Sequence, residues 1–291
     1  MVYYIKASRR LGGEIVMRRI VRMKTELMAQ EMRKLILTSL YHAKSGHPGG
    51  SLSCTDILAV LYNEEMNVDP ADPKKADRDR FVLSKGHAAP ALYAALALKG
   101  YFPVEDCNSL RKISSHLEGH PSMKSTPGVD ISTGSLGQGI SAACGMALSA
   151  KLHGQSYRVY SVLGDGEIEE GQVWEAMMFA AHYKLDNLCV FVDLNGLQID
   201  GATCEVMGSD PVPDKMRAFG FEVVEIDGHD YDAIRAALKT SRETVGKPTC
   251  VVARTVKGKG VSYMENQVDW HGAAPKQADY EIAMKELEQH G

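Results

Sequence analysis

The 291-residue sequence lacks several features that mark particular classes of protein. No apolar stretch approaches the ~18–20 residues that span a bilayer, which argues against a membrane protein. The formal charge is only −4, so the composition predicts no general attraction to nucleic acid or to an anionic membrane. Internal repeats, low-complexity tracts and a convincing domain boundary are also missing. What remains is an ordinary soluble composition, 44% hydrophobic and 24% charged, with enough length for a large core.

Cysteine is present but never in a C-x-x-C pair, the spacing typical of redox and metal sites. Most of the cysteines lie in apolar or helix-like surroundings. This usage predicts reduced, buried thiols and a cytoplasmic protein. The six positions are Cys54, Cys107, Cys144, Cys189, Cys204 and Cys250.

The first 24 residues carry seven basic side chains and one acid, Glu14. They lack an apolar core followed by a cleavage site, so we do not interpret them as a signal peptide. Met17 and Met23 could each begin the folded part. We therefore expect a basic, ragged extension over residues 1–23 and a single domain over residues 24–291.

The pattern of apolar residues predicts helices alternating with short strands. A helix fits residues 24–43, a break follows at 44–53, and residues 102–130 form a long irregular segment. The later strands read as uninterrupted apolar runs, which is typical of a parallel sheet covered on both faces. The expected fold class is therefore α/β, a parallel β-sheet with helices on both faces. The strands are predicted at 157–163, 187–194, 221–226 and 249–255.

Two oxygen-bearing side chains follow two of these strands. Asp165 lies between Gly164 and Gly166 after the first, and Asn195 follows the second about thirty residues later. The carboxyl ends of parallel strands joined by a helix share one sheet edge, where ligands bind in open α/β sheets. A carboxylate and an amide oxygen suit Mg²⁺ or Ca²⁺, although Asp-Gly and Asn-Gly are also common turn pairs.

This arrangement resembles the thiamine diphosphate motif of the transketolase family. Several stretches narrow the resemblance, and they occur in the order that the family has. These are KSGHPGGSLSCTDIL, FVLSKGHAAPALYA, HLEGHPS, TGSLGQGISAACGMAL, GDGEIEEGQVWEA and KGKGVSYMENQVDWHGAAP. The resemblance extends from about Met23 to the C-terminus. It implies a thiamine diphosphate-binding fold, specifically the diphosphate-binding domain, and transfer of a two-carbon ketol group in carbohydrate metabolism of the pentose phosphate kind.

The resemblance also implies roles for individual residues. Mg²⁺, replaceable by Ca²⁺ or Mn²⁺, would be held by Asp165, Asn195 and the carbonyl of Leu197. Catalytic contacts to the sugar are implied for His47, His120 and His271. Contacts to the cofactor are implied for a larger set, namely His87, Gly134, Ser135, Leu136, Gly166, Asn195, Ile199 and His271.

Four of the ten histidines, His47, His87, His120 and His271, lie beside glycine in predicted loops, where a ring can face a ligand. Imidazole titrates near neutrality and suits proton transfer or hydrogen bonding to a developing alkoxide. His116 is ambiguous. The other five are interpreted as structural or solvated: His42, His153, His182, His229 and His290.

Transketolases usually contain a pyrimidine-binding domain that supplies the glutamate activating the cofactor, and no such domain is found here. The resemblance therefore implies an N-terminal subunit working with a separate C-terminal subunit on sugar phosphates, as a heterotetramer. Glu170 matches a family glutamate at the subunit interface, although its acidic run also suits a helix N-terminus. Trp174 is expected in the core or an interface.

Four alternatives remain open. The chain is also consistent with a specialised ketol transferase for an unusual sugar phosphate or sulfosugar, or with a synthase of the deoxyxylulose-phosphate kind. A non-catalytic binding or regulatory subunit of the same fold is the third, and the intact Asp165, Asn195 and His271 argue against it. A truncated fragment is a further reading.

Overall fold

The computed structural model describes residues 13–289, with side chains from residue 25 onward. Its first element is the long helix α1 (Gly13–Ala43), which begins earlier than the predicted start at Lys24. The first twelve residues of the predicted basic extension, and His290, lie outside the described residues.

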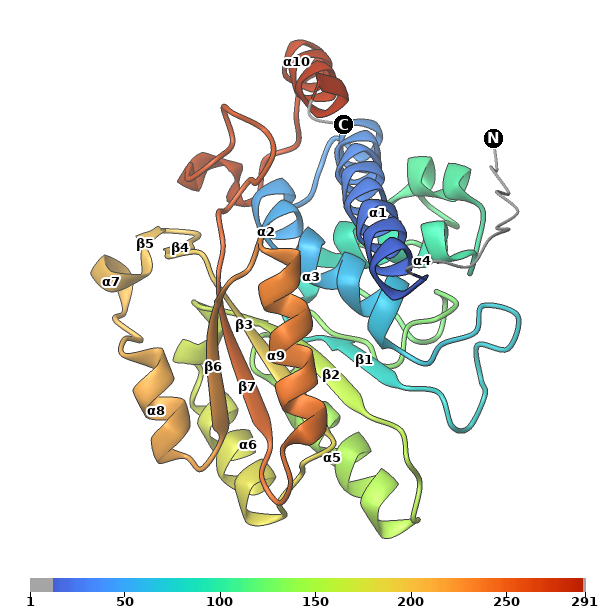
Figure 1. Ribbon diagram of the computed structural model, residues 1–291. Helices are drawn as coiled ribbons and strands as arrows, with labels where there is room; N and C mark the ends of the chain where they lie inside the picture. Colours follow the sequence, from blue (N-terminus) through green and yellow to red (C-terminus); the bar gives the residue numbers. More distant parts are fainter. Residues whose placement is uncertain (1–12, 290–291) are drawn as a thin grey trace.

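Five parallel strands form the central sheet, in the order β1-β2-β3-β7-β6 (Figure 1). Because every pairing is parallel, the carboxyl ends of all five strands share one edge. The predicted α/β class is confirmed, and the later strands lie close to where the apolar runs predicted them. The strands are β1 (Arg80–Leu83), β2 (Val159–Gly164), β3 (Leu188–Leu194), β6 (Glu222–Asp227) and β7 (Thr249–Arg254).

Both faces of the sheet are buried, each in its own apolar cluster. Tyr160 and Val162 of β2 point into one cluster, and Val159 and Leu163 point into the other. This alternation explains why the strands are apolar throughout. The first cluster is covered by α1, α3 (Thr55–Val60), α4 (Ala89–Lys99) and α9 (Tyr231–Glu243), and the second by α5 (Gln138–Leu152), α6 (Gly171–His182) and α8 (Val212–Ala218) (Figure 1).

Short elements surround the sheet edge where the strands end. The predicted break at 44–53 is shorter than expected, because α2 (Pro48–Ser53) is helical and proline is tolerated in a first turn. The hairpin of β4 (Leu197–Gln198) and β5 (Gly201–Ala202) was not predicted, since strands this short leave no periodic signal. The remaining elements are η1 (Leu61–Glu65), η2 (Gly86–Ala88), η3 (Val104–Ser109), η4 (Glu167–Glu169), α7 (Thr203–Val206), η5 (Val268–His271) and α10 (Gln277–Gln289).

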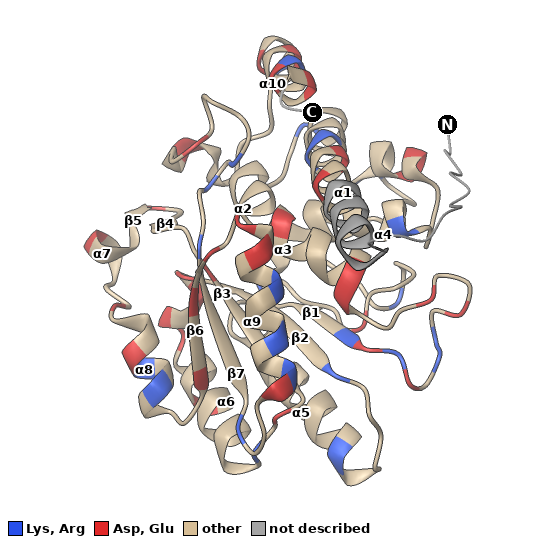
Figure 2. Cartoon of the chain, viewed as in Figure 1, with Lys and Arg blue, Asp and Glu red and all other residues tan. Residues whose placement is uncertain are grey.

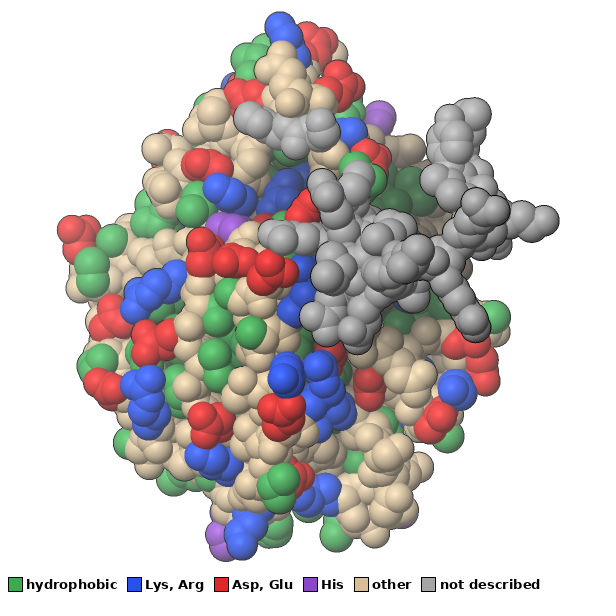
Figure 3. Space-filling model, in the orientation of Figure 1, with side chains coloured by type: hydrophobic (Ala, Val, Ile, Leu, Met, Phe, Trp, Pro, Cys, Tyr) green, Lys and Arg blue, Asp and Glu red, His purple; other side chains and the backbone are tan. Residues whose placement is uncertain are grey.

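The surface carries charges of both signs. Acidic and basic side chains are interspersed over the face shown in Figure 3, in agreement with the small net charge. Within residues 13–289, no helix has the length and apolar character needed to cross a bilayer. The described cysteines form no disulfide; Cys204 is exposed and the other five are buried.

Candidate active site

A pocket of about 240 Å³ opens at the carboxyl edge of the sheet. β2 and β3 are direct neighbours, with Gly164 opposite Asp193, so Asp165 and Asn195 emerge side by side as the sequence predicted. Short loops and the β4–β5 hairpin complete the walls. The lining residues are Gly50, Lys85, His87, Leu136, Gly164, Asp165, Gly166, Glu167, Asn195, Leu197, Gln198, Ile199, Lys257 and His271.

Asp165 is almost fully buried, with 3% of its surface exposed. Its two oxygens accept hydrogen bonds from the backbone amides of Gly166 (2.9 Å) and Gly196 (2.5 Å). Burial, and then the charge of Asp193, raise the pKa of Asp165 to about 6. No lysine, arginine or histidine of the described residues lies within ion-pair distance of this carboxylate. A buried carboxylate of this kind is suited to a bound cation.

The oxygens expected to join Asp165 around a cation face the same pocket. Asn195 Oδ1 accepts a hydrogen bond from the amide of Leu197 (3.2 Å), and the carbonyl of Leu197 accepts one from Lys257 Nζ (2.9 Å). A carboxylate, an amide oxygen and a backbone carbonyl form a hard-oxygen set that fits Mg²⁺ and leaves room for phosphate oxygens. A Cβ at Gly166 would lie 3.0 Å from Gln198 Oε1, so glycine keeps this wall of the pocket open.

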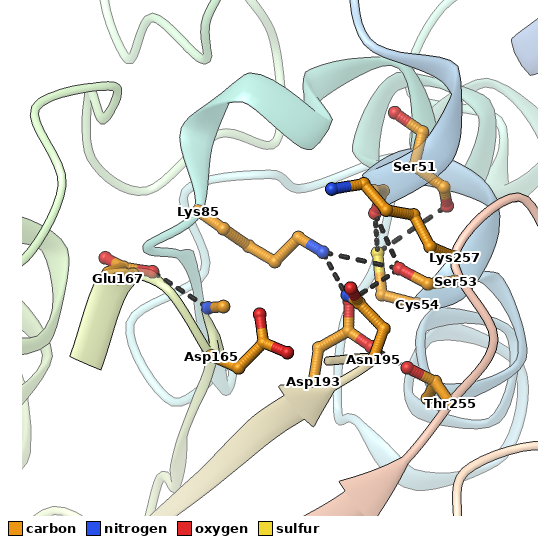
Figure 4. Close-up of polar contacts among 12 residues, drawn as sticks. Ser51, Ser53, Cys54, Lys85, Asp165, Glu167, Asp193, Asn195, Thr255 and Lys257 are labelled. Atoms are coloured by element: carbon orange, nitrogen blue, oxygen red, sulfur yellow. Dashed lines mark hydrogen bonds and ion pairs between the residues drawn. The ribbon is translucent and has the colours of Figure 1, made fainter. Parts of the chain in front are cut away.

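A fully buried ion pair lies behind the predicted cation site. Figure 4 shows Lys85 reaching across to the carboxylate of Asp193, with Asp165 beside them. Ser53 Oγ donates a hydrogen bond to Asp193 Oδ2 (2.6 Å), and Thr255 bonds the other carboxylate oxygen. The Lys85 ammonium, in its low-dielectric surroundings, holds the pKa of Asp193 below its ordinary value despite burial. This pair fixes the floor of the pocket.

The four glycine-flanked histidines predicted as functional come together at the mouth of the pocket; we call His47, His87, His120 and His271 the histidine cluster. The ring centroid of His47 lies 5.4 Å from that of His87, 5.6 Å from that of His271 and 6.4 Å from that of His120. His87 and His271 stack at 5.3 Å. Four separate segments of the chain supply these side chains, with His87 in η2 and His271 in η5, so only the tertiary fold assembles them.

The pKa of every ring in the histidine cluster is lowered, which favours the neutral imidazole. Burial is the first cause in each case. The charge of Arg111 adds to burial at His47 and that of Lys257 adds to it at His271, so that the pKa of each falls to about 4. The pKa values of His87 and His120 are also lowered. A neutral imidazole offers one donor and one acceptor nitrogen. His47 Nδ1 is buried without a hydrogen-bond partner among the described residues.

The other predicted residues divide between the pocket and its surroundings. Leu136 and Ile199 line the pocket, and Ile199 is 63% exposed. Gly134 packs behind the ring of His120, where a Cβ would lie 2.9 Å from Cγ, whereas Ser135 is exposed and does not line the pocket. His116 lies apart, bonded to Asp106 (3.0 Å).

Two residues on or beside α6 were predicted at an interface or in the core. Glu170 is exposed at the N-cap of α6, against Gly137. Trp174 is partly buried against Phe219, with ring centroids 5.1 Å apart, and packs on the second apolar cluster. Neither lines the pocket.

Sequence reasoning missed three charged side chains at the site. Lys257 is 2% exposed, and its Nζ lies 2.9 Å from His271 Nδ1. Burial, followed by the charge of Lys85, lowers the pKa of Lys257 to about 8. Glu167 is buried and accepts hydrogen bonds from Ser84 Oγ and from the amides of Gly137 and Gly164. Lys85 and Lys257 both lie beside glycine in strand-to-loop segments, the signal that singled out the histidines.

Parallel strands, a polar pocket at their carboxyl edge and a glycine beside the acidic residue are typical of α/β proteins that bind a phosphate-containing ligand at the ends of the strands. The comparisons with known proteins agree. Residues 24–290 match the family model described as transketolase, thiamine diphosphate binding domain. The chain belongs to this family, as its motifs predicted.

Similar proteins occur in two lengths. A 6-deoxy-6-sulfo-D-fructose transketolase subunit from Clostridium sp. is 46% identical over 263 residues, covering 90% of this chain and 96% of the relative. An apulose-4-phosphate transketolase subunit from Phocaeicola vulgatus is 43% identical over 262 residues, covering 90% of this chain and 93% of the relative. The transketolase of Pongo abelii is 44% identical over 246 residues, but only 39% of it is covered.

Solved structures agree with the sequence comparison. The transketolase of Leishmania mexicana superposes with a TM-score of 0.86 at 35% identity, over 91% of this chain and 41% of that chain. The chain is thus the thiamine diphosphate-binding component of a ketol transferase, similar in extent to relatives named as subunits.

Proposed function

We propose that this chain, loaded with thiamine diphosphate and Mg²⁺ and joined to a C-terminal subunit, transfers a two-carbon ketol group from a ketose phosphate to an aldose phosphate. The observation that carries the proposal is that Asp165, Asn195, Leu197, His87 and His271 line one pocket, with the other two rings of the histidine cluster beside it.

The floor of the pocket supplies the groups that would hold the cofactor. Asp165, Asn195 and the carbonyl of Leu197 would bind Mg²⁺, and Ca²⁺ or Mn²⁺ would suit the same oxygens. Gly166 would let the diphosphate approach the backbone. Lys257, whose ammonium already lies on the Leu197 carbonyl, would neutralise phosphate charge. His87 and His271 lie within the same walls and would contact the diphosphate.

The upper part of the pocket would position the reacting end of the cofactor and the sugar. Leu136, with the backbone of Gly134 and Ser135, would meet the aminopyrimidine, and Ile199 would pack near the thiazolium. When bound, the cofactor supplies the nucleophilic carbon that takes up the two-carbon unit.

The neutral rings of His47, His120 and His271 would bind the sugar hydroxyl groups. Each can donate one hydrogen bond to an oxygen on which charge develops and accept one from a hydroxyl group. Their lowered pKa values support this role, because a protonated ring has no acceptor nitrogen.

A specialised donor is the second candidate. The two relatives covered over more than nine-tenths of their length carry names that specify 6-deoxy-6-sulfo-D-fructose and apulose 4-phosphate. These names favour an unusual sugar phosphate or sulfosugar over the common pentose phosphates, with the same chemistry at the cofactor.

The proposed partner carries the pyrimidine-binding domain and its activating glutamate, most simply in a heterotetramer. Support comes from α5 and α6, which are nearly free of charged side chains (Figure 2) and expose Leu152, Met178 and Phe179. The buried, unpaired cysteines support a cytoplasmic location.

The test is reconstitution. The chain is purified alone and with the product of a neighbouring reading frame that encodes a pyrimidine-binding subunit, then supplied with thiamine diphosphate and Mg²⁺. Ketol transfer by the pair, and none by either chain alone, is expected. Full turnover by the purified single chain would overturn the two-subunit proposal.

A further inference from the structure

The loops that follow β6 and β7 meet at the same sheet edge as the pocket. The two strands are direct neighbours, and the amide of Gly228 donates a hydrogen bond to the carbonyl of Arg254 (2.8 Å). A Cβ at Gly228 would lie 2.5 Å from Thr255 Cγ2, so the missing side chain permits this close approach. The approach places the next residue, His229, against the segment that contains Lys257.

The ring of His229 is bonded at both of its nitrogens. Its side chain, which the sequence predicted to be structural or solvated, is 13% exposed. Nε2 lies 2.9 Å from the backbone nitrogen of Val256, and Nδ1 lies 2.7 Å from Asp56 Oδ2. Because a backbone N–H can only donate, Nε2 is the acceptor, and Nδ1 carries the proton that it donates to Asp56. The two bonds therefore select one tautomer of the ring.

Asp56 of α3 orients this ring. The residue is 3% exposed, and its carboxylate also accepts two hydrogen bonds from Arg33 (3.0 and 2.6 Å) and one from the hydroxyl of Tyr231 (2.6 Å). Burial acts to raise the pKa of Asp56, but the charge of Arg33 holds it below its ordinary value. An ionised carboxylate can only accept hydrogen bonds, so it keeps the proton of His229 on Nδ1.

The backbone on either side of Lys257 is tied to other elements. The amide of Gly258 donates to the carbonyl of Gly49 in α2 (3.0 Å), and a Cβ at Gly49 would lie 2.9 Å from Lys257 Cγ. On the preceding side, the amide of Val256 donates to the ring of His229. This second bond connects the buried network around Asp56 to the backbone that directs the lysine.

The ammonium of Lys257 lies between two groups of the pocket. It donates to the carbonyl of Leu197 (2.9 Å), and it lies 2.9 Å from His271 Nδ1. Leu197 is a proposed cation ligand, and His271 is a proposed contact of the diphosphate. Because the lysine is only 2% exposed, its packed side chain has little freedom to compensate for a displaced backbone.

We propose that His229, oriented by Asp56, is a positioning residue for the cofactor site: it holds the Val256 amide and so keeps the Lys257 ammonium where the diphosphate binds. This inference rests on the proposed function, in which Lys257 neutralises phosphate charge. His229 does not line the pocket, so it acts on cofactor affinity through another residue. The network that joins α1, α3 and α9 thereby becomes part of the support of the site.

Two amide side chains can each keep one bond of the ring. Asparagine matches the place of Nδ1 and can still donate to Asp56, whereas glutamine matches the place of Nε2 and can still accept from Val256. In the reconstituted two-subunit enzyme, His229→Asn should weaken binding of thiamine diphosphate with Mg²⁺ by about 10-fold, and His229→Gln should restore most of the affinity. Calorimetric titration measures each affinity. His153→Asn is the control, since His153 is exposed at the C-cap of α5.

A second comparison tests whether His229 acts through Lys257. If it does, the two substitutions are not additive, and His229→Asn should change cofactor affinity by less than about twofold when Lys257→Ala is already present. A general structural role would instead weaken cofactor binding equally with and without Lys257. The melting temperature of each variant is measured alongside, and it should not follow the changes in affinity.

The outcomes separate this inference from the proposed function. If the wild-type pair does not bind the cofactor, both fail. If it binds the cofactor but transfers no ketol group, the proposed function fails, and the calorimetric comparisons still decide the role of His229. Unchanged affinity in His229→Asn, an equal loss in His229→Gln, or a full additional loss beside Lys257→Ala would overturn the inference while the function stands. Loss of folded structure in His229→Asn, seen by circular dichroism, would also overturn it, because the ring would then serve the fold and not the site.

Discussion

Burial of the Asp165 carboxylate without an ion pair to any described residue is the single-residue feature that points most directly to a bound metal. Its two oxygens accept hydrogen bonds from the amides of Gly166 and Gly196, which fixes the carboxylate at the ends of β2 and β3. Deep burial without a counter-ion normally disfavours the charged form of a carboxylate. A divalent cation would reverse that balance, because the charged form would then be the one stabilised.

We expect Asp165→Ala to weaken binding of thiamine diphosphate with Mg²⁺ by about 2–3 kcal/mol, since a phosphate with a poorly held cation is under-neutralised. Calorimetric titration of the cofactor into the reconstituted enzyme measures this loss of affinity. Asp186→Ala is the control, because Asp186 pairs with Lys151 at the opposite edge of the sheet. Equal cofactor affinity in the Asp165 and Asp186 variants would refute the metal assignment.

His120 should act on the sugar and not on the cofactor, because its ring does not line the pocket that holds the cation site. His120→Ala is expected to reduce kcat/KM for the donor by about 1–3 kcal/mol, the value of one hydrogen bond, with cofactor affinity nearly unchanged. His116→Ala serves as the matched control from the same loop, since His116 bonds Asp106 outside the site. A fall in cofactor affinity with unaltered sugar kinetics would reverse the division of roles.

At the scale of secondary-structure elements, the packing of α5 against the end of β1 supports one wall of the site. Gly139 begins this contact, and a Cβ there would lie 2.7 Å from Ser84 Oγ and 2.8 Å from Ser84 Cα. Ser84 in turn donates a hydrogen bond to Glu167, which also accepts hydrogen bonds from the amides of Gly137 and Gly164. A displaced α5 would therefore disturb the loop that contains Leu136.

Two glycines of α5 provide a matched pair. Gly139→Ala should lower the free energy of unfolding of the isolated chain by about 1–3 kcal/mol, since backbone of the neighbouring segment must move. Gly145→Ala should raise it by about 0.5–1 kcal/mol, because no atom lies within 4 Å of the new Cβ and alanine favours the helix. Urea unfolding followed by circular dichroism tests both. The packing argument fails if the two substitutions change stability in the same direction.

The elements and the site were predictable from the sequence to different degrees. The buried strands were predictable because apolar residues on both faces leave a long unbroken run, and Asp165 and Asn195 followed from parallel topology. Lys85 and Lys257 were missed because a lysine beside glycine normally indicates a solvated loop, and only tertiary packing shows both buried. The start of α1 was missed because the basic side chains suggested a ragged extension, although Val16, Ile20 and Met23 have helical spacing.

For the molecule as a whole, the contrast between its faces supports the proposal that the partner subunit binds over α5 and α6. α8 and α9 carry many charged residues, whereas α5 and α6 carry few (Figure 2). On α6, Met178 is 57% exposed, and Tyr183 at its C-cap is 46% exposed, a concentration of apolar surface that monomers rarely present to water.

Phe179→Asp should weaken assembly with the partner subunit by about 2 kcal/mol or more, roughly 30-fold, because a charge in an apolar contact cannot be paired. Light scattering after size-exclusion chromatography measures the assembled mass at several concentrations. Val245→Asp is the control, an exposed valine in the turn between α9 and β7. Unchanged assembly of the Phe179 variant would remove this face from the interface.

The hydrogen bonds from Gly166 and Gly196 to Asp165 have a consequence for local unfolding of the protein. Both amides closely follow the two central strands, β2 and β3, which belong to the part of a fold that separates last. Their deuterium exchange should therefore be slow even before any ligand is added, close to the rate set by global unfolding. The irregular loop around His120 depends on isolated turns and should exchange much faster. We therefore expect the proposed cation end of the site to be preformed and the loop that carries His120 to unfold locally more often.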